Sequence, residues 1–187
     1  MDQPTQGLTR PLKNVFFHFI DFLNRESIPY AVIGGIAVTL TANERFTRDA
    51  DFTVLLTEEQ SARLVKIFQG DPSYEVKQIN FNSSQTIADF FRVIWQGTPV
   101  DLLVANTDYQ KELIVRAKTY RVQGADVRIA TPEDLIVLKL LADRPVDRQD
   151  IEFILKVSPS IDWNYIQKWC AEWGIEDRLK TLRAQSK

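Results

Sequence analysis

The sequence lacks the residues that build disulfide frameworks and thiolate metal centres. Cys170 is the only cysteine among the 187 residues. One cysteine cannot form a disulfide within the chain, and a metal site built from several thiolates is excluded. A reducing cytoplasm is the compartment that this composition favours.

The chain also lacks a strong net charge. It carries 23 basic and 25 acidic residues, which gives a net charge of −2. There is therefore no overall positive field that would hold nucleic acid through its phosphates. A local basic strip remains for such contacts, formed by Lys111, Arg116, Lys118 and Arg121.

Long apolar runs are absent as well. No run of uncharged apolar residues reaches the length of about 18 that a membrane helix needs. The first segment, Met1 to Pro11, is polar and has no apolar signal core. We therefore expect a soluble, cytoplasmic protein with no membrane partner.

The residues that are present suffice for a substantial core. Apolar residues make up 44% of the chain and include eleven phenylalanines, which allows one core and at most two small domains. There is no internal repeat and no low-complexity segment. The best place for a boundary lies between Gly124 and Pro132, so we expect a core over 1–130 and a helical C-terminal subdomain over 131–187 that completes a cleft.

Apolar periodicity and turn residues predict an α+β fold, in which a mixed β-sheet is flanked by helices and followed by a helical C-terminal segment. Strands are predicted at residues 30–33, 51–56, 74–81, 90–95 and 100–105, with a hairpin over 119–129. Helices are predicted from Leu12 to before Pro29 and at residues 36–42, 57–68, 108–117, 132–142, 147–157, 162–173 and 176–184. Two helix starts carry clear capping signals, the capping box from Thr57 to Gln60 and Thr131 before Pro132.

Gly34 and Gly35 stand between a predicted strand and a predicted helix. Glycine allows positive φ and close approach of the backbone to a ligand, and the N–H groups at a helix start suit a phosphate. Most glycine pairs are plain turns, so this pair is weak evidence by itself.

Asp49 and Asp51 alternate at the start of the next predicted strand. Their side chains therefore project from one face, with backbones roughly 6.6 Å apart at a rise of about 3.3 Å per residue. Both carboxylates can then converge on one ion, and magnesium prefers oxygen ligands. Two ions about 3.5–4 Å apart would need a third carboxylate. Asp101, an acid within an otherwise apolar strand, is the candidate.

A simpler interpretation of Asp49 and Asp51 is a loop end and a strand start whose acids are merely solvated. Asp101 is harder to explain in this way, because an unpaired charge in a buried strand is costly and usually has a partner. Together with the glycine pair, the three acids favour a metal site, which remains a motif hypothesis for the structure to test.

Several basic residues are candidates for contact with a triphosphate. Arg45 and Arg48 lie just before the acids and either touch a triphosphate or acceptor or are surface charges. Lys139 lies on the apolar stripe of its helix, where a lysine is expected only if its ammonium reaches a partner. That partner is either a triphosphate oxygen, which we favour, or Asp143 in an i,i+4 salt bridge.

Asp147 and Asp150 share one face of the next predicted helix with apolar residues. They either pair structurally with Arg144 or Arg148, or face the cleft and bind the nucleotide or position the acceptor. The sequence leaves both interpretations open.

These residues resemble the pattern of the nucleotidyltransferase superfamily typified by DNA polymerase beta and kanamycin nucleotidyltransferase. In that pattern a hydrophobic residue precedes Gly-Gly or Gly-Ser, two aspartates flank a hydrophobic residue, and a third acid lies on a later strand. The matching segments are Ile33-Gly34-Gly35, Asp49-Ala50-Asp51-Phe52 and Val100-Asp101-Leu102, within about residues 28–105.

A narrower resemblance extends to about residue 157. The region from Thr131 through Lys139 to Asp150 is similar to the bacterial group that includes the nucleotidyltransferase toxins of abortive-infection type IV systems. The chain departs from the superfamily pattern at Gly35, where many members have a serine whose hydroxyl contacts phosphate. Toxins of the narrower group are often longer, so the compact C-terminal part leaves the choice of acceptor open.

The resemblance implies a magnesium-dependent nucleotidyltransferase that binds two Mg²⁺ ions through Asp49, Asp51 and Asp101. An acceptor hydroxyl would attack the α-phosphorus of a nucleoside triphosphate in line, with Asp101 as the base and pyrophosphate as the leaving group. The predicted nucleotide-binding residues are Gly34, Gly35, Arg48, Lys139, Asp147 and Asp150.

Three functional hypotheses follow. The first is an enzyme that moves a nucleoside monophosphate from a triphosphate such as ATP to a hydroxyl of tRNA, a protein or a small molecule. The second is a catalytically inactive nucleotide-binding or partner-interaction module of the same fold, against which the three intact acids count. The third is a cellular role compatible with the first, the toxin of a toxin–antitoxin pair, whose partner would be an antitoxin.

Overall fold

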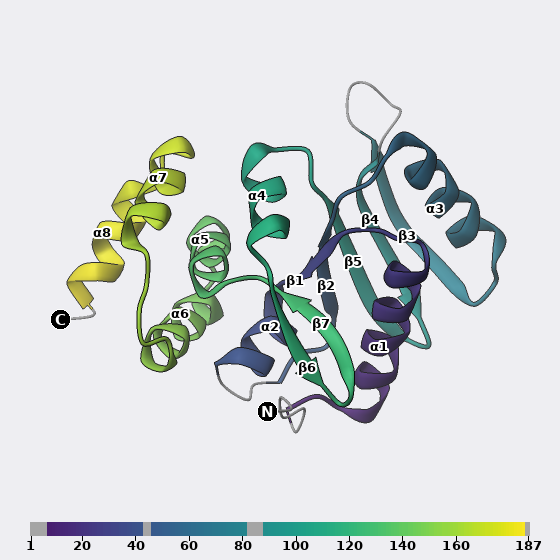
Figure 1. Ribbon diagram of the computed structural model, residues 1–187, viewed down its shortest axis with the longest axis horizontal. Coiled ribbons are helices and arrows are strands. Elements are labelled where there is room, and N and C mark those ends of the chain that lie inside the picture. Colours follow the sequence, from purple (N-terminus) through teal and green to yellow (C-terminus); the bar gives the residue numbers. More distant parts are fainter. Residues whose placement is uncertain (1–6, 43–45, 82–87, 186–187) are drawn as a thin grey trace.

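The computed structural model describes residues 7–42, 46–81 and 88–185. The first half contains α1 (Arg10–Arg25), β1 (Tyr30–Val32), α2 (Gly34–Thr41), β2 (Ala50–Val54), α3 (Glu58–Gly70), β3 (Tyr74–Phe81), β4 (Ala88–Trp95) and β5 (Thr98–Val104). The second half contains α4 (Asp108–Arg116), β6 (Lys118–Val122), β7 (Ala125–Ile129), α5 (Pro132–Ala142), α6 (Pro145–Val157), α7 (Trp163–Glu172) and α8 (Glu176–Gln185). The predicted α+β fold with a helical C-terminal segment is confirmed (Figure 1).

The observed elements differ from the predicted ones mainly at their ends. Helix α2 begins at Gly34, so the glycine pair forms the first turn of the helix instead of preceding it. Helix α6 begins at Pro145 and not at residue 147, because proline is well suited to a first turn whose N–H groups have no helical partner. The capping box at Thr57 and the N-cap at Thr131 are both present.

The described strands form one seven-stranded sheet in the order β3-β4-β5-β2-β1-β7-β6. The β2–β5 and β1–β7 pairs are parallel and the other pairs are antiparallel. The β4–β5 and β6–β7 hairpins turn at Gln96-Gly97 and Gln123-Gly124, and all four residues have positive φ. Two-residue turns of this kind match the twist of the strands and fix their register.

Alternation along the strands gives the sheet two different faces. Helices α1 and α3 cover one face, where Phe16 of α1 stacks on Phe52 of β2 and Phe68 of α3 contacts Phe91 of β4. The ring centroids of these two pairs are 6.0 and 5.8 Å apart. Because consecutive side chains of a strand point to opposite faces, Asp51 projects away from this aromatic layer.

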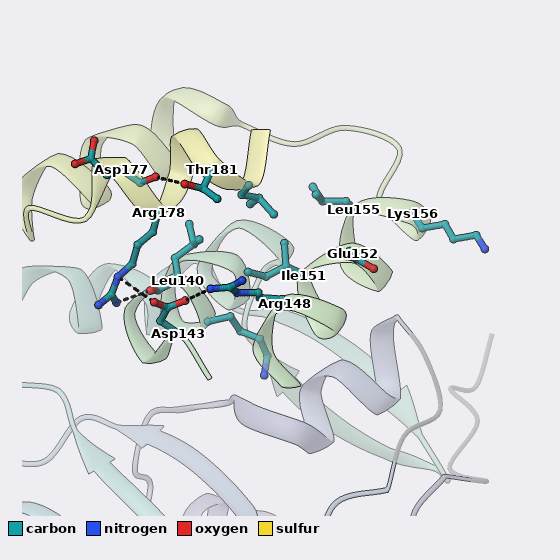
Figure 2. A pocket seen from close by; sticks show the side chains of 12 residues that line it. Leu140, Asp143, Arg148, Ile151, Glu152, Leu155, Lys156, Asp177, Arg178 and Thr181 are labelled. Atoms are coloured by element: carbon teal, nitrogen blue, oxygen red, sulfur yellow. Dashed lines mark hydrogen bonds and ion pairs between the residues drawn. The ribbon is translucent and has the colours of Figure 1, made fainter. Parts of the chain in front are cut away.

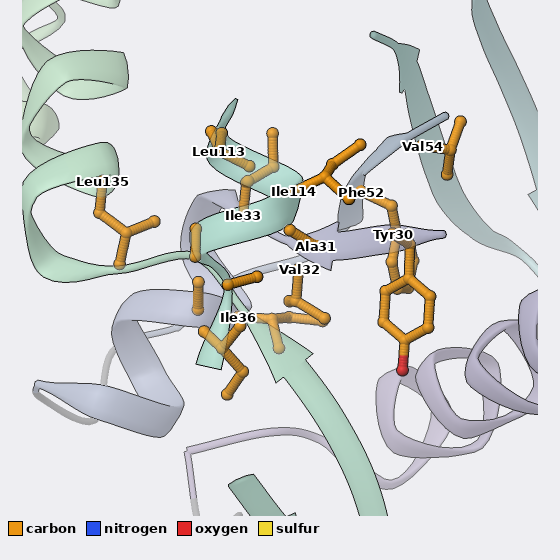
Figure 3. Packing of buried hydrophobic residues seen from close by; sticks show 14 of the residues in the cluster. Tyr30, Ala31, Val32, Ile33, Ile36, Phe52, Val54, Leu113, Ile114 and Leu135 are labelled. Carbon is orange, nitrogen blue, oxygen red and sulfur yellow. The ribbon is translucent and has the colours of Figure 1, made fainter. Parts of the chain in front are cut away.

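The junction between β1 and α2 is packed tightly. Val32 and Ile36 have no exposed surface, and Figure 3 shows Ile36 of α2 beside Val32 of β1. The backbone N–H of Ile33 donates a hydrogen bond of 3.0 Å to the carbonyl of Asp51. The start of α2 is therefore fixed against β2 by packing and by a main-chain contact.

A buried carboxylate connects the C-terminal helices to α4. Asp134 of α5 accepts hydrogen bonds of 2.6 Å from the hydroxyls of Thr131 and of Tyr165 in α7. Its main-chain carbonyl accepts a bond of 3.0 Å from the hydroxyl of Tyr109 in α4. Burial raises the pKa of the Asp134 carboxyl, and the hydroxyls of Thr131 and Tyr165 and the charge of Arg116 oppose the shift. In Figure 1, α5 to α8 accordingly form a group on the side of the molecule away from α1 and α3.

The predicted division between residues 130 and 131 falls in the short link from β7 to α5. Ala130 and Thr131 are buried, and the N–H of Ala130 donates a hydrogen bond of 3.0 Å to the carbonyl of Val32. The link is therefore packed against the sheet, and the division into two domains stays a prediction. Among the described residues, no helix has the length and apolar character needed to cross a membrane.

Candidate active site

The sheet face opposite α1 and α3 borders a cavity of about 620 Å³. This volume lies in the range of pockets that bind small molecules. Strands β2, β4 and β5, the start of α2 and the corner between α5 and α6 contribute to it. Its lining contains the predicted site residues Gly34, Gly35, Arg48, Asp49, Asp51, Asp101, Lys139 and Asp147. Asp150 is not part of the lining, and its carboxylate contacts Lys139. Arg45 is outside the described residues.

Asp51, Asp101 and Arg92 lie side by side on three neighbouring strands. Strands β2 and β5 are parallel with Asp51 opposite Asp101, and β4 and β5 are antiparallel with Arg92 opposite Asp101. Directly opposed residues project from the same face of a sheet. The register therefore brings together two acids that are far apart in the sequence and adds a cation to them.

The acids of the cavity perturb one another. Burial and the charges of Asp49 and Asp101 raise the pKa of the Asp51 carboxyl to about 7. Asp49 lies just before β2, and its Oδ1 accepts a hydrogen bond of 2.9 Å from the hydroxyl of Thr47. A bound cation would relieve the repulsion among these carboxylates.

Arg92 occupies both carboxylate oxygens of Asp101. Its Nε lies 2.7 Å from Oδ1 and its Nη2 lies 2.5 Å from Oδ2, which is the bidentate geometry that suits guanidinium and carboxylate. The hydrogen bonds and charge of Asp101 raise the pKa of the Arg92 guanidinium. Asp101 is 8% exposed while Arg92 is 47% exposed, so the pair joins a buried acid to a cation at the cavity wall.

Gly34 occupies a position that only glycine can fill without strain. Its φ is +64°, and a Cβ added there would lie 2.0 Å from Oδ2 of Asp51. The backbone conformation and the close contact each require glycine. Because α2 begins at Gly34, the first N–H groups of this helix have no partner within it, and they lie beside the acids.

Lys139 is the centre of a buried ion cluster that joins α5 to α6. Its Nζ lies 3.0 Å from Oδ1 of Asp147 and 2.5 Å from Oδ2 of Asp150, and none of the three side chains is more than 4% exposed. The alternative pairing of Lys139 with Asp143 is therefore wrong. Burial opposes ionisation of Asp147, but hydrogen bonds from Arg144 and Lys139 hold the pKa of this carboxyl below its usual value.

Asp143 belongs to a second cavity. It ends α5 in the left-handed conformation, with φ at +49°. Figure 2 shows its carboxylate between two arginines, 3.6 Å from Nη2 of Arg148 and 3.5 Å from Nε of Arg178. These groups line a space of about 560 Å³ between α5, α6 and α8. Lys139 lines both cavities, so its ion cluster forms part of the wall between them.

Two further arginines lie on the rim of the first cavity. Arg144 precedes α6, and its Nε lies 2.8 Å from Oδ2 of Asp147. Its pKa is raised by the hydrogen bonds and charge of Asp147 and by the charge of Asp51. Arg48 is exposed, and its guanidinium lies 5.4 Å from the ring centroid of Phe46. Two exposed arginines thus bring positive charge to the cavity.

The donor types fit a divalent cation such as Mg²⁺, because carboxylate oxygens are its preferred protein ligands. Burial and, after it, the charges of Asp49 and Asp101 raise the pKa of Asp51, and a cation beside these acids would oppose both effects. The grouping is not a preformed ligand set, since Arg92 engages both oxygens of Asp101. Over the described ranges, no three His, Cys, Asp or Glu side chains are grouped closely enough to hold a metal ion. The guanidinium of Arg92 therefore competes with a cation for Asp101.

Sequence reasoning overlooked Arg92, Arg144 and Thr47 as site residues. Arg92 was missed because the predicted turn over residues 96–99 would set Ile94 opposite Asp101, whereas the observed two-residue turn sets Arg92 there. Arg144 was predicted only as a candidate structural partner, beside Arg148, of Asp147 and Asp150. Thr47 had no distinguishing pattern, since its contact depends on the path of the chain before β2.

The close contact at Gly34 predicts an effect beyond backbone strain. Gly97 also has positive φ, but no atom lies within 4 Å of an added Cβ, so Gly97→Ala should lose only about 1–2 kcal/mol of unfolding free energy. Gly34→Ala should lose clearly more, because its methyl group must displace Asp51. Urea denaturation of both variants measures the difference, and equal losses would contradict the packing described here.

The raised pKa of Asp51 predicts an unusual pH dependence of stability. The folded-state pKa of about 7 lies above the unfolded value near 4. The ionised carboxylate of Asp51 therefore destabilises the folded state, and the unfolding free energy falls as the pH rises through this interval. In EDTA, Asp51→Asn should raise the unfolding free energy by about 2–4 kcal/mol at pH 8, and the gain should vanish near pH 4. Asp126→Asn, at an exposed acid, is the control. A destabilised Asp51→Asn variant at pH 8 would count against the shift.

The ion cluster predicts a structural cost for the loss of Lys139. Lys139→Met leaves two buried carboxylates without their shared cation and should lower the unfolding free energy by about 3–5 kcal/mol. Lys180→Met removes an exposed lysine that also pairs with an aspartate, and it should leave the unfolding free energy unchanged. Similar stabilities of the two variants in urea would show that the buried cluster is not needed for folding.

Solved structures with a similar fold are nucleotidyltransferases or proteins described as resembling them. An antigenic nucleotidyltransferase-like protein from Paracoccidioides brasiliensis is 22% identical, with 94% of each chain covered and a TM-score of 0.55. The lincosamide antibiotic adenylyltransferase LnuA, solved with lincomycin bound, is 14% identical over 81% of this chain and 99% of its own, with a TM-score of 0.59. The antibiotic-resistance factor ANT(2'')-Ia is 20% identical over 92% of this chain and 90% of its own, with a TM-score of 0.53. At these identities the likeness shows the fold.

A comparison with curated proteins found no match. The sequence of residues 13–176 matches a family described as "Nucleotidyl transferase of unknown function (DUF2204)". The match includes the glycine pair, the three acids and the ion cluster around Lys139. The narrower resemblance to abortive-infection type IV toxins is not addressed by this match and stays a prediction. On the extent of this match, the chain belongs to the DUF2204 family of nucleotidyltransferases.

Proposed function

We propose that this enzyme transfers a nucleoside monophosphate from a nucleoside triphosphate to a hydroxyl group of an acceptor and releases pyrophosphate. The main observation in support is that Asp51 and Asp101 stand in register on parallel strands, beside the glycine start of α2, in one cavity. Metal-binding acids next to a phosphate-binding helix start are the arrangement that this chemistry requires.

We assign Asp49, Asp51 and Asp101 to two magnesium ions, which when bound would stabilise the charge on the attacking and leaving oxygens. The backbone of Gly34 and Gly35 then holds the triphosphate at the start of α2. Asp101 accepts the proton of the acceptor hydroxyl. The hydroxyl oxygen forms a bond to the α-phosphorus while the bond from that phosphorus to pyrophosphate breaks.

The positive charge around the triphosphate is assigned to Arg48 and Arg144. Both lie on the cavity rim with exposed side chains, and Asp147 orients the guanidinium of Arg144. The predicted contact of Lys139 with the triphosphate would require its ammonium to leave two buried carboxylates. We therefore infer that Lys139, with Asp147 and Asp150, supports the nucleotide site by holding α6 in place.

The lining of the cavity favours an acceptor with few positive charges. Its charged residues are Asp49, Asp51, Asp101, Asp147, Arg48, Arg92, Lys139 and Arg144. The four acids are already assigned to metal ions or to internal pairs, so none is left to bind the ammonium groups of a polycation. Phe46, Leu141 and Val146 add an apolar rim and are 63%, 43% and 37% exposed. We propose a hydroxyl acceptor with an apolar face, on a small molecule, a protein or tRNA.

A role as a toxin is the cellular setting that we propose on the narrower sequence resemblance. Expression should then arrest growth, Asp49→Ala should abolish the arrest, and an antitoxin should be the partner that relieves it. The second candidate is a catalytically inactive module of the same fold. The presence of all three acids in one cavity counts against it.

Labelling of acceptors tests the proposed activity. Each α-³²P-labelled nucleoside triphosphate is incubated with Mg²⁺, cell extract and the full chain, and labelled RNA, protein and small molecules are separated. We expect one acceptor class to become labelled by the wild type and by Asp126→Asn, and not by Asp51→Asn. Labelling that survives Asp51→Asn, or triphosphate binding without any labelled product, would contradict the proposal.

A further inference from the structure

Arg92 has a contact that the proposed reaction leaves unexplained. Its guanidinium donates to both oxygens of Asp101, the acid assigned as a metal ligand and base. An arginine held in this way neutralises the acid and places a positive charge where a metal ion would approach. Each oxygen of Asp101 keeps a second lone pair, but the adjacent guanidinium charge opposes the approach of a metal ion to this acid.

The pair is asymmetric in a way that allows separation. Asp101 is buried, and a buried carboxylate without a cation is costly, so the acid needs a positive partner at all times. Arg92 is about half exposed and belongs to the cavity lining, so its guanidinium has a solvated position to move to. Of the two groups, only the arginine can leave its partner without a large desolvation cost.

The surroundings of Arg92 suit a second, phosphate-bound position. Phe90 lies two residues earlier on β4 and therefore on the same face, and its ring centroid is 5.6 Å from the guanidinium carbon. This ring supports the side chain beside the acids. Guanidinium groups bind phosphate oxygens with the same fork that binds a carboxylate. A triphosphate in the cavity therefore offers Arg92 an equivalent partner.

We propose that Arg92 is a positioning residue that acts as the resident counter-ion of Asp101. In the metal-free protein it holds Asp101 in place and neutralises it. With a divalent cation and the triphosphate present, Asp101 would hold the cation, and Arg92 would pair its guanidinium with the triphosphate instead. The inference rests on the proposed function, because it takes Asp101 as the metal ligand.

The test measures Mn²⁺ binding by electron paramagnetic resonance, using the full chain without nucleotide. Arg92→Gln removes the competing charge, and its affinity for Mn²⁺ should rise about tenfold, which corresponds to ~1.4 kcal/mol. The matched control is Arg121→Gln, because Arg121 forms a cross-strand pair with Asp126 of 2.8 Å far from the cavity. Its affinity for Mn²⁺ should equal that of the wild type.

A second readout separates positioning from a purely structural role. With Mg²⁺ and the triphosphate, Arg92→Gln should raise the KM for the triphosphate, because the guanidinium no longer reaches it. Arg92→Lys keeps the charge but not the fork, so both its Mn²⁺ affinity and its KM should lie between wild type and Arg92→Gln. If Arg92→Gln fails to fold, Mn²⁺ affinity and KM are compared between the wild type and Arg92→Lys instead.

The outcomes distinguish this inference from the proposed function. If the wild type binds Mn²⁺ and Arg92→Gln binds it equally or more weakly, the counter-ion role is overturned while the nucleotidyl-transfer proposal stands. If neither the wild type nor Arg92→Gln binds Mn²⁺, the metal assignment fails and the inference fails with it. Tighter Mn²⁺ binding together with a raised KM supports the exchange.

Discussion

The parallel pairing of β2 with β5 is the constraint on which the candidate site depends. It sets Asp51 opposite Asp101, and the antiparallel pairing of β4 with β5 then sets Arg92 beside them. A shift of one residue in either register would turn these side chains toward the aromatic layer under α1 and α3. Gly34 depends on the same register, because its missing side chain leaves the space that the Asp51 carboxylate fills. The same strand register thus determines both which side chains enter the core and which side chains form the site.

The C-terminal helices complete the cavity through a second constraint, the cluster of Lys139, Asp147 and Asp150. It sets one positive charge against two negative ones, and Arg144 at the rim supplies the second positive charge. A buried cluster of this kind is no guarantee of high stability, because desolvation offsets much of the attraction. Its evident consequence is positional, since it fixes α6 relative to α5 and holds Arg144 at the mouth. The position of Lys139 on the apolar stripe of α5 is therefore explained by its two carboxylate partners on α6.

From the sequence we predicted the fold and most of the charged residues that line the cavity, but not the contacts that these residues make with one another. Strand alternation, capping residues and hairpin turns are local signals, which is why the elements were predicted to within a few residues. The pairing of Asp101 with Arg92 was missed because the predicted turn was two residues longer than the observed one, which shifts the register of the hairpin. The partners of Lys139 were missed because they depend on how α5 packs against α6, and an i,i+4 rule describes only one helix. The roles of the site residues stay predictions.

The central claim is that Asp49, Asp51 and Asp101 bind the metal ions of a nucleotidyl-transfer site. A crystal structure of the full chain with Mg²⁺ and a non-hydrolysable triphosphate analogue tests it most directly. The account predicts magnesium bound to all three carboxylates and phosphate oxygens at the backbone of Gly34 and Gly35. A triphosphate bound elsewhere, or magnesium that none of the three acids touches, would contradict it.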